Sequence, residues 1–306
     1  PSLPMSSINE MRRQVLSDIF KKRRDFLPGP EFELEDYPHV QNRTSTPEIT
    51  VSVLSGRQLS RDMVELRPAV LYIPLEEISG CTDAIDAFMK NGVTRICVTV
   101  PRIIHDDERK KAARLLDEAR SYGIDEALVG NIGHMLFAAQ HGFKLRGDFG
   151  LNIFNSRSLR VIRELGLISA TLSFEMRLEQ IRDVSKAIDT EIITYGRLPL
   201  MITENCIVKS SLGTCSCDNF TGITDRMGAQ FPVVREFGCR NTVLNSHTLF
   251  LGDKQGDTDR LGPWATRLSF TTENSRECVA VLKRYMSLGD YEPAGKTRGL
   301  YYRGVE

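Results

Sequence analysis

The sequence predicts an α/β protein built as a TIM-like (β/α) barrel, either complete or one unit short of eight. Between residues 49 and 196, short apolar runs rich in β-branched residues alternate with amphipathic helical stretches. Gly92, Gly123, Gly142 and Gly166 each precede the next apolar run by a few residues, as glycines that end helices do. Repeated strand–helix units imply a parallel sheet, and about seven units of this length suit a barrel better than an open sheet. Neither G-x-G-x-x-G nor G-x-x-x-x-G-K-[ST] follows a run, so nucleotide-binding versions of this architecture have no support.

Length and charge limit the class of protein. The chain has 306 residues, of which 41% are apolar and 26% charged, as in soluble globular proteins. Lys plus Arg and Asp plus Glu both total 40, which removes any whole-chain electrostatic argument for nucleic acid or anionic membrane. No apolar run approaches the roughly 18 residues that span a bilayer, and no secretory signal opens the chain. We therefore expect a cytoplasmic location and no membrane partner. Because the first residue is Pro, we expect a processed chain or a fragment.

Residues 1–48 are predicted to form an N-terminal helix and a linker arm. The helix is expected from residue 6 to 25, capped by Ser6 or Ser7. Four prolines between residues 25 and 48 predict the irregular arm. The basic run at 21–24 could contact RNA but is more typical of a solvated helix end. The helix is expected to carry one apolar face, formed by Ile8, Met11, Val15, Ile19 and Phe20.

Residues 49–306 are assigned to the barrel. Helices are predicted at 83–92 and 107–123. Residues 201–265, rich in Cys, Asn, Thr, Gly and Asp, are expected to form a cysteine-rich insertion after the last barrel strand, and 266–306 a closing helix and tail. The predicted strands are 49–54, 69–75, 95–100, 126–131, 148–154, 169–174 and 191–196, with short candidates at 231–236, 242–246 and 248–253 in the insertion.

Polar residues follow several predicted strands, where barrel enzymes place their functional groups. His134 is the candidate acid–base residue because its usual pKa lies near neutrality. Glu175 and Arg197 could pair or hold a small anionic ligand at the mouth. For each residue alone, a turn-forming or structural role is at least as good an explanation. The candidate cofactor-binding residues at the same strand ends are Asn152, Asn155 and Tyr195.

Four cysteines, Cys206, Cys215, Cys217 and Cys239, cluster in the insertion with spacing C-x8-C-x-C-x21-C. A disulfide is disfavoured in a reducing compartment, and a nucleophilic thiol lacks a histidine within the cluster. Buried structural thiols remain an alternative, although these cysteines lie in polar sequence. Four thiolates could hold Zn or an iron–sulfur cluster, and the spacing does not decide between the two metals. The residues alone therefore leave a metal site and buried thiols about equally supported.

Four segments carry a resemblance to a known family: "EIITYGRLPLMITENC", "TDRMGAQFPVV", "CRNTVLNS" and the terminal "TRGLYYRGVE". Together they resemble the collagenase-like peptidase U32 family. The likeness is to the C-terminal barrel of long, two-barrel bacterial members, and "LPMSSINEMRRQ" resembles the segment that introduces that barrel. The resemblance implies an incomplete or distorted barrel, and it implies that an N-terminal barrel of the same protein is missing from this chain.

The resemblance also implies a cofactor and a reaction. Several relatives carry four cysteines that hold an iron–sulfur cluster and take part in hydroxylating RNA bases or quinone precursors. Carried over to this chain, the ligands are Cys206, Cys215, Cys217 and Cys239, holding a [4Fe–4S] cluster or alternatively Zn. The cluster is expected near the mouth beside Arg197 and Glu204, which makes Glu204 a further candidate catalytic residue. The first barrel's usual pattern "HGALC…SG.C" is replaced here by "YGRLPLMITENC", which leaves the exact four ligands open.

The expected function is therefore an RNA-modifying enzyme of the hydroxylating type, with RNA or a small anionic organic molecule as its partner. The first alternative is a metal- or thiol-dependent peptidase, that is, a hydrolase as the family name says. The sequence contains no G-x-S-x-G or H-E-x-x-H motif to support it. The second alternative is a non-catalytic barrel, structural or RNA-binding, that Zn stabilises.

Overall fold

The computed structural model describes residues 4–24, 38–214 and 221–304. The chain divides into two compact units, residues 1–38 and 39–306, which are considered separately. The first unit contains helix α1 (Met5–Arg24), whose apolar side chains are exposed. Ser6 and Ser7 lie inside this helix, which begins at Met5, so the expectation that one of them caps it is wrong. None of the helices in the described ranges is long and apolar enough to cross a membrane.

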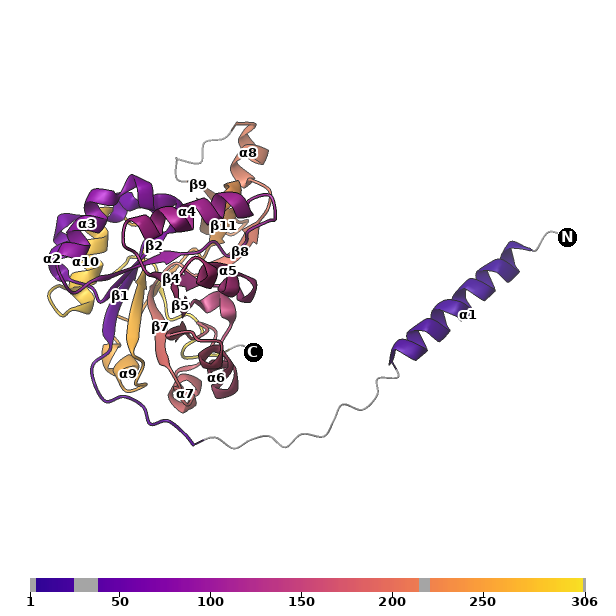
Figure 1. The fold of residues 1–306 in the computed structure, drawn as a ribbon, viewed down its shortest axis with the longest axis horizontal. Helices are drawn as coiled ribbons and strands as arrows, with labels where there is room; N and C mark the ends of the chain where they lie inside the picture. Colours follow the sequence, from indigo (N-terminus) through magenta and orange to yellow (C-terminus); the bar gives the residue numbers. More distant parts are fainter. Residues whose placement is uncertain (1–3, 25–37, 215–220, 305–306) are drawn as a thin grey trace. The chain divides into compact units, whose positions relative to one another are not determined.

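The second unit is a closed barrel of eight parallel strands surrounded by helices, which confirms the predicted fold class (Figure 1). It closes because the last strand pairs with both the first and the seventh, for example Leu268 beside Val51 and Ala265 beside Glu191. The barrel strands are β1 (Glu48–Ser52), β2 (Val70–Pro74), β3 (Arg95–Thr99), β4 (Glu126–Val129), β5 (Lys144–Gly147), β6 (Ser169–Thr171), β7 (Asp189–Gly196) and β13 (Ala265–Ser269).

Helices cover the outside of the barrel. Apolar strand residues such as Val51, Leu71 and Val98 are fully buried in the layer between strands and helices. Their neighbours Tyr72 and Cys97 belong to a separate buried cluster inside the barrel, as the two-residue period of a strand requires. The helices are α2 (Arg61–Leu66), α3 (Thr82–Lys90), α4 (Arg109–Ser121), α5 (Met135–Gln140), α6 (Ser156–Glu164), α7 (Leu178–Asp183), α8 (Ile207–Leu212), α9 (Gln255–Asp259) and α10 (Ser275–Tyr285).

The fifth barrel strand differs from the prediction. Residues 148–154 were expected to form it, but the strand is β5 at 144–147. The carboxylate of Asp148 accepts the backbone N–H of Phe149 and starts a single 3-10 turn, Phe149–Leu151. Asn152 then takes a left-handed conformation with φ of 52°. A side chain that caps a turn therefore outweighed the apolar pattern of this segment.

The cysteine-containing excursion is inserted between the seventh and eighth strands of the barrel. It forms a separate antiparallel sheet in the order β8–β11–β10–β9. The strands are β8 (Pro199–Thr203), β9 (Thr221–Thr224), β10 (Gln230–Arg235) and β11 (Asn241–Leu244). Strand β12 (Thr248–Phe250) returns to the barrel, where it pairs antiparallel with β7 and parallel with the short β14 (Lys296–Thr297).

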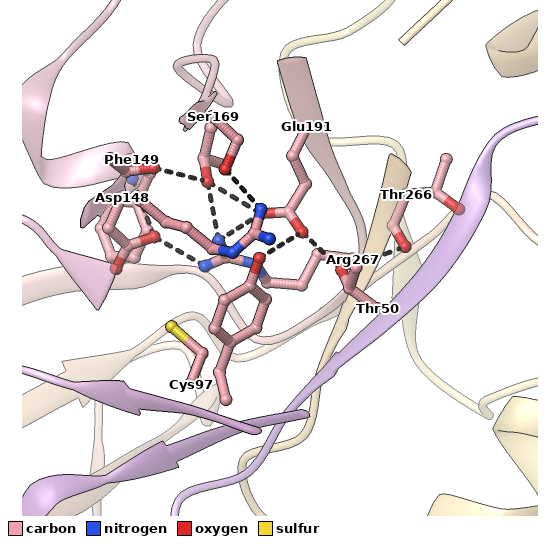
Figure 2. Close-up of polar contacts among 12 residues, drawn as sticks. Thr50, Cys97, Asp148, Phe149, Ser169, Glu191, Thr266 and Arg267 are labelled. Carbon is pink, nitrogen blue, oxygen red and sulfur yellow. Dashed lines mark hydrogen bonds and ion pairs between the residues drawn. The ribbon is translucent and has the colours of Figure 1, made fainter. Parts of the chain in front are cut away.

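Charged side chains fill the inside of the barrel (Figure 2). Arg267 of β13 donates to Asp148 at 2.6 Å and also contacts Glu191 of β7, and each of these side chains is at most 7% exposed. The Glu191 carboxylate accepts from the Tyr72 hydroxyl at 3.0 Å. A second buried pair joins Arg146 to Glu126 at 2.6 Å. Because side chains occupy this space, a binding site has no room inside the barrel and would have to lie at its mouth.

Candidate metal centre at the mouth of the barrel

The four-stranded sheet lies against the loop that follows barrel strand β3. Arg240, in the turn before β11, donates to Glu108 at 2.9 Å. Arg102 pairs with Glu236 at 3.2 Å. The loop follows the C-terminal end of β3, and α4 begins directly after Glu108. These pairs therefore place the small sheet on the face of the barrel where active sites of this fold occur.

Cys206 and Cys239 lie at the same end of this sheet. Thr203, the last residue of β8, pairs with Asn241, the first residue of β11. Cys206 follows Thr203 by three residues and Cys239 precedes Asn241 by two. The Asn241 side chain also accepts the backbone N–H of Ile207 at 2.6 Å, which ties the start of α8 to β11. Strand pairing therefore places the chain segments that carry Cys206 and Cys239, 33 positions apart in the sequence, at the same end of the small sheet.

Cys239 has an unusual backbone conformation. Its φ is 64°, and the preceding Gly238 has a φ of 70°. A left-handed conformation costs a residue other than glycine about 1–2 kcal/mol. Gly238 itself has no room for a side chain, because an added Cβ would lie 2.0 Å from Glu108 Oε1. The turn is thus packed against α4 in a shape that leaves the Cys239 side chain exposed.

Cys206 caps α8, and its sulfur accepts the backbone N–H of Lys209 at 3.4 Å. An N–H···S contact of this kind is compatible with a metal-bound thiolate, as are the partial exposure of Cys206 and the exposure of Cys239. Cys215 and Cys217 lie outside the described residues. In the ranges that are described, no three His, Cys, Asp or Glu side chains are grouped for a metal. Cys206 and Cys239 are therefore the two predicted ligands that the structure describes, both at least partly exposed, and the ligand set stays a prediction.

Glu204 lies beside these cysteines, in contact with Arg240 and His105. Its Oε1 accepts from Arg240 Nε at 2.7 Å and lies 3.2 Å from His105 Nε2. The hydrogen bond from Arg240 is the main cause that lowers the pKa of Glu204. The carboxylate is therefore anionic at neutral pH and already paired. No sequence signal singled out Arg240 or His105, because both contacts depend on the loop after β3 meeting the insertion.

His134 lies at the end of the β4 loop, about half buried. Its Nδ1 is 3.1 Å from the carbonyl oxygen of Pro101. A carbonyl can only accept, so Nδ1 carries the proton and Nε2 is left as an acceptor. Burial lowers the pKa of His134, which keeps the ring neutral at pH 7. This arrangement is compatible with the predicted role as a general base.

Glu175 and Arg197 do not form the predicted pair in the described structure. Glu175 is exposed, and its backbone N–H contacts the Ser173 hydroxyl at 3.3 Å. Arg197 donates to the backbone carbonyl groups of Asn245, at 3.0 Å, and Ser246. The guanidinium therefore holds the chain between β11 and β12, and Glu175 remains available to a partner.

The three candidate cofactor-binding residues have local structural roles. Asn155 caps α6 by accepting the Ser158 N–H at 2.9 Å, and Asn152 ends the turn after β5. The Tyr195 hydroxyl donates to Glu273 at 3.0 Å, in a buried position beside the ring of Tyr285. These contacts agree with the turn-forming alternative for the two asparagines.

Comparison with known proteins finds a family model that matches part of the chain. Residues 75–219 match the model described as Peptidase family U32. Over this segment the chain is similar to peptidase family U32. The matched segment includes Cys206, Cys215 and Cys217 and ends before Cys239, so Cys239 joins the candidate centre on geometry.

Two curated relatives match part of the chain. One is the 23S rRNA 5-hydroxycytidine C2501 synthase of Escherichia coli, 27% identical over 116 residues, which are 37% of this chain and 18% of the relative. The other is the uncharacterized protease MJ0090 of Methanocaldococcus jannaschii, 25% identical over 117 residues, which are 36% and 28% of the two chains. Among solved structures, the U32 peptidase Mk0906 superposes with a TM-score of 0.42 at 10% identity, over 80% of this chain and 98% of Mk0906. The aligned part thus spans less than a third of either curated relative.

Proposed function

We propose that this U32-like barrel belongs to an enzyme that hydroxylates a base of RNA or performs a related oxidative modification. In this proposal Cys206, Cys215, Cys217 and Cys239 hold a [4Fe–4S] cluster at the mouth of the barrel. The partner is RNA, with a small anionic organic molecule as the other candidate substrate.

The observation that carries the proposal is the placement of Cys206 and Cys239. Strand pairing brings them to one end of a sheet that lies on the catalytic face of a barrel. Buried structural thiols would be shielded from solvent, as Cys97 and Cys278 are, whereas Cys239 is exposed. An exposed cysteine in a strained turn, at the same end of the sheet as a second cysteine, is more typical of a ligand than of a packing residue.

The relative from Escherichia coli supports the reaction class. It is named for making a hydroxylated cytidine in ribosomal RNA, and it shares sequence with 37% of this chain. When bound, an iron–sulfur cluster supplies electron transfer. The chain itself supplies thiolate ligands, a neutral imidazole at His134 and a paired carboxylate at Glu204.

Metal analysis of protein purified without oxygen tests the proposal. The wild type should contain about four iron and four sulfide per chain and absorb near ~400 nm. Cys206→Ser and Cys239→Ser should each lose most of the iron. Cys81→Ala is the control, because Cys81 is buried in the hydrophobic core before α3 and its sulfur donates to the backbone carbonyl of Glu77. Iron content unchanged in both serine variants would overturn the site.

The alternatives give different results in the same preparation. Colourless protein with one zinc per chain would replace the iron–sulfur proposal by a Zn-stabilised barrel. The second curated relative is named a protease, so casein and gelatin cleavage should be measured as well. Cleavage of casein or gelatin by the pure, metal-loaded protein, lost when a single residue is replaced, would favour the peptidase. RNA treated with the metal-loaded protein and a two-electron oxidant that donates oxygen should instead gain the mass of one oxygen atom, and the oxidant should be reduced in equal amount.

A further inference from the structure

Three loops at the mouth of the barrel bring one arginine and two phenylalanines together. Arg102 follows β3, Phe149 follows β5 and Phe174 follows β6. The Arg102 guanidinium carbon lies 5.3 Å from the centre of the Phe149 ring. The Phe149 and Phe174 ring centres are 5.4 Å apart with an angle of 50° between their planes. All three side chains are partly exposed, so they form an aromatic and cationic surface at the mouth.

Phe149 is held in place by the charged interior of the barrel. Asp148 Oδ1 accepts the Phe149 N–H at 2.8 Å and the Arg267 Nη1 at 2.6 Å (Figure 2). Arg267 is buried and bound to strand β7 through Glu191. The aromatic ring is thus attached to a rigid part of the fold, as a preformed binding surface requires.

Arg102 is also fixed by its surroundings. Its side chain runs along Gly130, where an added Cβ would lie 3.3 Å from Arg102 Cγ. Asn131 donates its side-chain amide to the Arg102 carbonyl at 3.0 Å. Arg102 Nη2 contacts Glu236 Oε1 at 3.2 Å. Glu236 precedes Cys239 by only three residues, so the aromatic surface lies next to the candidate metal centre.

The charges of this surface favour a base over a phosphate. The Arg102 cation is balanced by Glu236, which leaves little net attraction for an anion. Guanidinium planes and aromatic rings remain able to stack on a flat heterocycle, as RNA-binding proteins use them to hold unpaired bases. Stacking is tolerant of sequence and requires the base to be out of its duplex.

We propose that Arg102, Phe149 and Phe174 form a stacking site for one unpaired base of single-stranded RNA, beside the cysteine centre. This proposal rests on the proposed function for its substrate class and adds the residues that receive the base. These three are binding and positioning residues, and the chemistry is left to the neighbouring centre.

A short single-stranded RNA carrying the fluorescent base aminopurine tests the site. Binding should quench the fluorescence, and the same RNA with an abasic position should bind about 10- to 100-fold more weakly. Phe149→Leu and Phe174→Leu keep apolar volume and remove the ring, so each should weaken binding of the base-containing RNA by a similar factor. Neither change should affect binding of the abasic RNA.

Phe143→Leu is the matched control, because Phe143 also packs against an arginine: the guanidinium carbon of Arg120 lies 5.5 Å from the centre of the Phe143 ring. Phe143 precedes β5 and therefore lies at the opposite end of the barrel. Equal binding of the base-containing and abasic RNAs by the wild type would overturn the proposal even if both leucine variants failed to fold. The proposal would also be overturned if Phe143→Leu weakened binding of the base-containing RNA as much as folded Phe149→Leu does.

The stacking site and the metal centre can fail separately. Cys206→Ser should keep the quenching signal while it loses iron, and Phe149→Leu should keep iron while it loses quenching. Iron without quenching in the wild type would leave the proposed function standing and reject the stacking site. Quenching in protein that binds no iron would reject the metal centre alone.

Discussion

Replacing Arg267 by methionine should lower the free energy of unfolding by about 3–5 kcal/mol, because it leaves buried carboxylates without their cation. Arg267 and Glu191 are each 2% exposed at the side chain, and Asp148 is 7% exposed. Burial alone would lower the pKa of Arg267, but Glu191 and Asp148 outweigh it and raise the pKa, so the guanidinium is charged. Since domains are stable by about 5–15 kcal/mol, this loss would consume a large part of the total.

Urea unfolding at pH 7, followed by circular dichroism, measures the effect. Arg298→Met is the control, because Arg298 pairs with Asp253 where the side chains are 29% and 31% exposed, and its only other hydrogen bond in the described part of the chain is to the Phe250 carbonyl. An exposed pair contributes about 0–1 kcal/mol. The double variant Arg267→Met/Glu191→Gln should lose less than the two single losses combined, because it removes both charges of a contacting pair. Equal losses for Arg267→Met and Arg298→Met would refute the reasoning.

Three further predictions concern a turn, a histidine and two thiols. Gly262→Ala should lower the free energy of unfolding by about 2 kcal/mol or more, because the φ of Gly262 is 63° and an added Cβ would lie 2.6 Å from the backbone nitrogen of Arg43. Gly256→Ala, at a helix position with open space around it, should not lower this free energy in the same urea assay. Burial lowers the pKa of His134 from 6.5, so the unfolded chain takes up a proton at a higher pH than the folded chain does. The free energy of unfolding of the wild type, relative to that of His134→Gln, should therefore fall as the pH drops below 6.5. If this difference in free energy stayed constant from pH 7.5 to 5.5, the prediction would be wrong. Burial raises the pKa of Cys97, so iodoacetamide should modify exposed Cys239 of metal-free protein and spare Cys97 until it unfolds, as mass spectrometry of the peptides would reveal.

The strands were predictable where a run of apolar, β-branched residues contains no side chain that caps a turn. Residues 95–100 and 191–196 were predicted as strands from β-branched content, and they form most of β3 and β7. Residues 148–154 were not predictable in this way. Their apolar pattern resembles a strand, while Asp148 caps a turn and bonds to a guanidinium from the far end of the chain. The true strand, 144–147, carries two basic residues and reads as polar.

The candidate site was predictable in part. Clustered cysteines in a polar segment indicated the insertion, and strand pairing places the segments that carry Cys206 and Cys239 at the same end of the small sheet. The asparagines that follow strands mislead, because the same residue type serves turns and ligands equally well. Arg102 and Phe149 gave no sequence signal of their own. Their contact arises because the loops after β3 and β5 lie close together at the mouth of a closed barrel.

The sequence by itself determined the barrel, because short apolar runs and amphipathic helical stretches alternate along the chain, and each of these patterns favours its strand or helix locally. Only the tertiary structure decided what fills the barrel and what lies at its mouth. Arg267 meets Asp148 and Glu191 across 119 and 76 residues. Buried charges are tolerated only where such distant partners neutralise one another. The same closure brings the cysteine-bearing sheet onto the loop after β3, since Arg240 and Glu108 lie 132 residues apart and pair only in the folded chain.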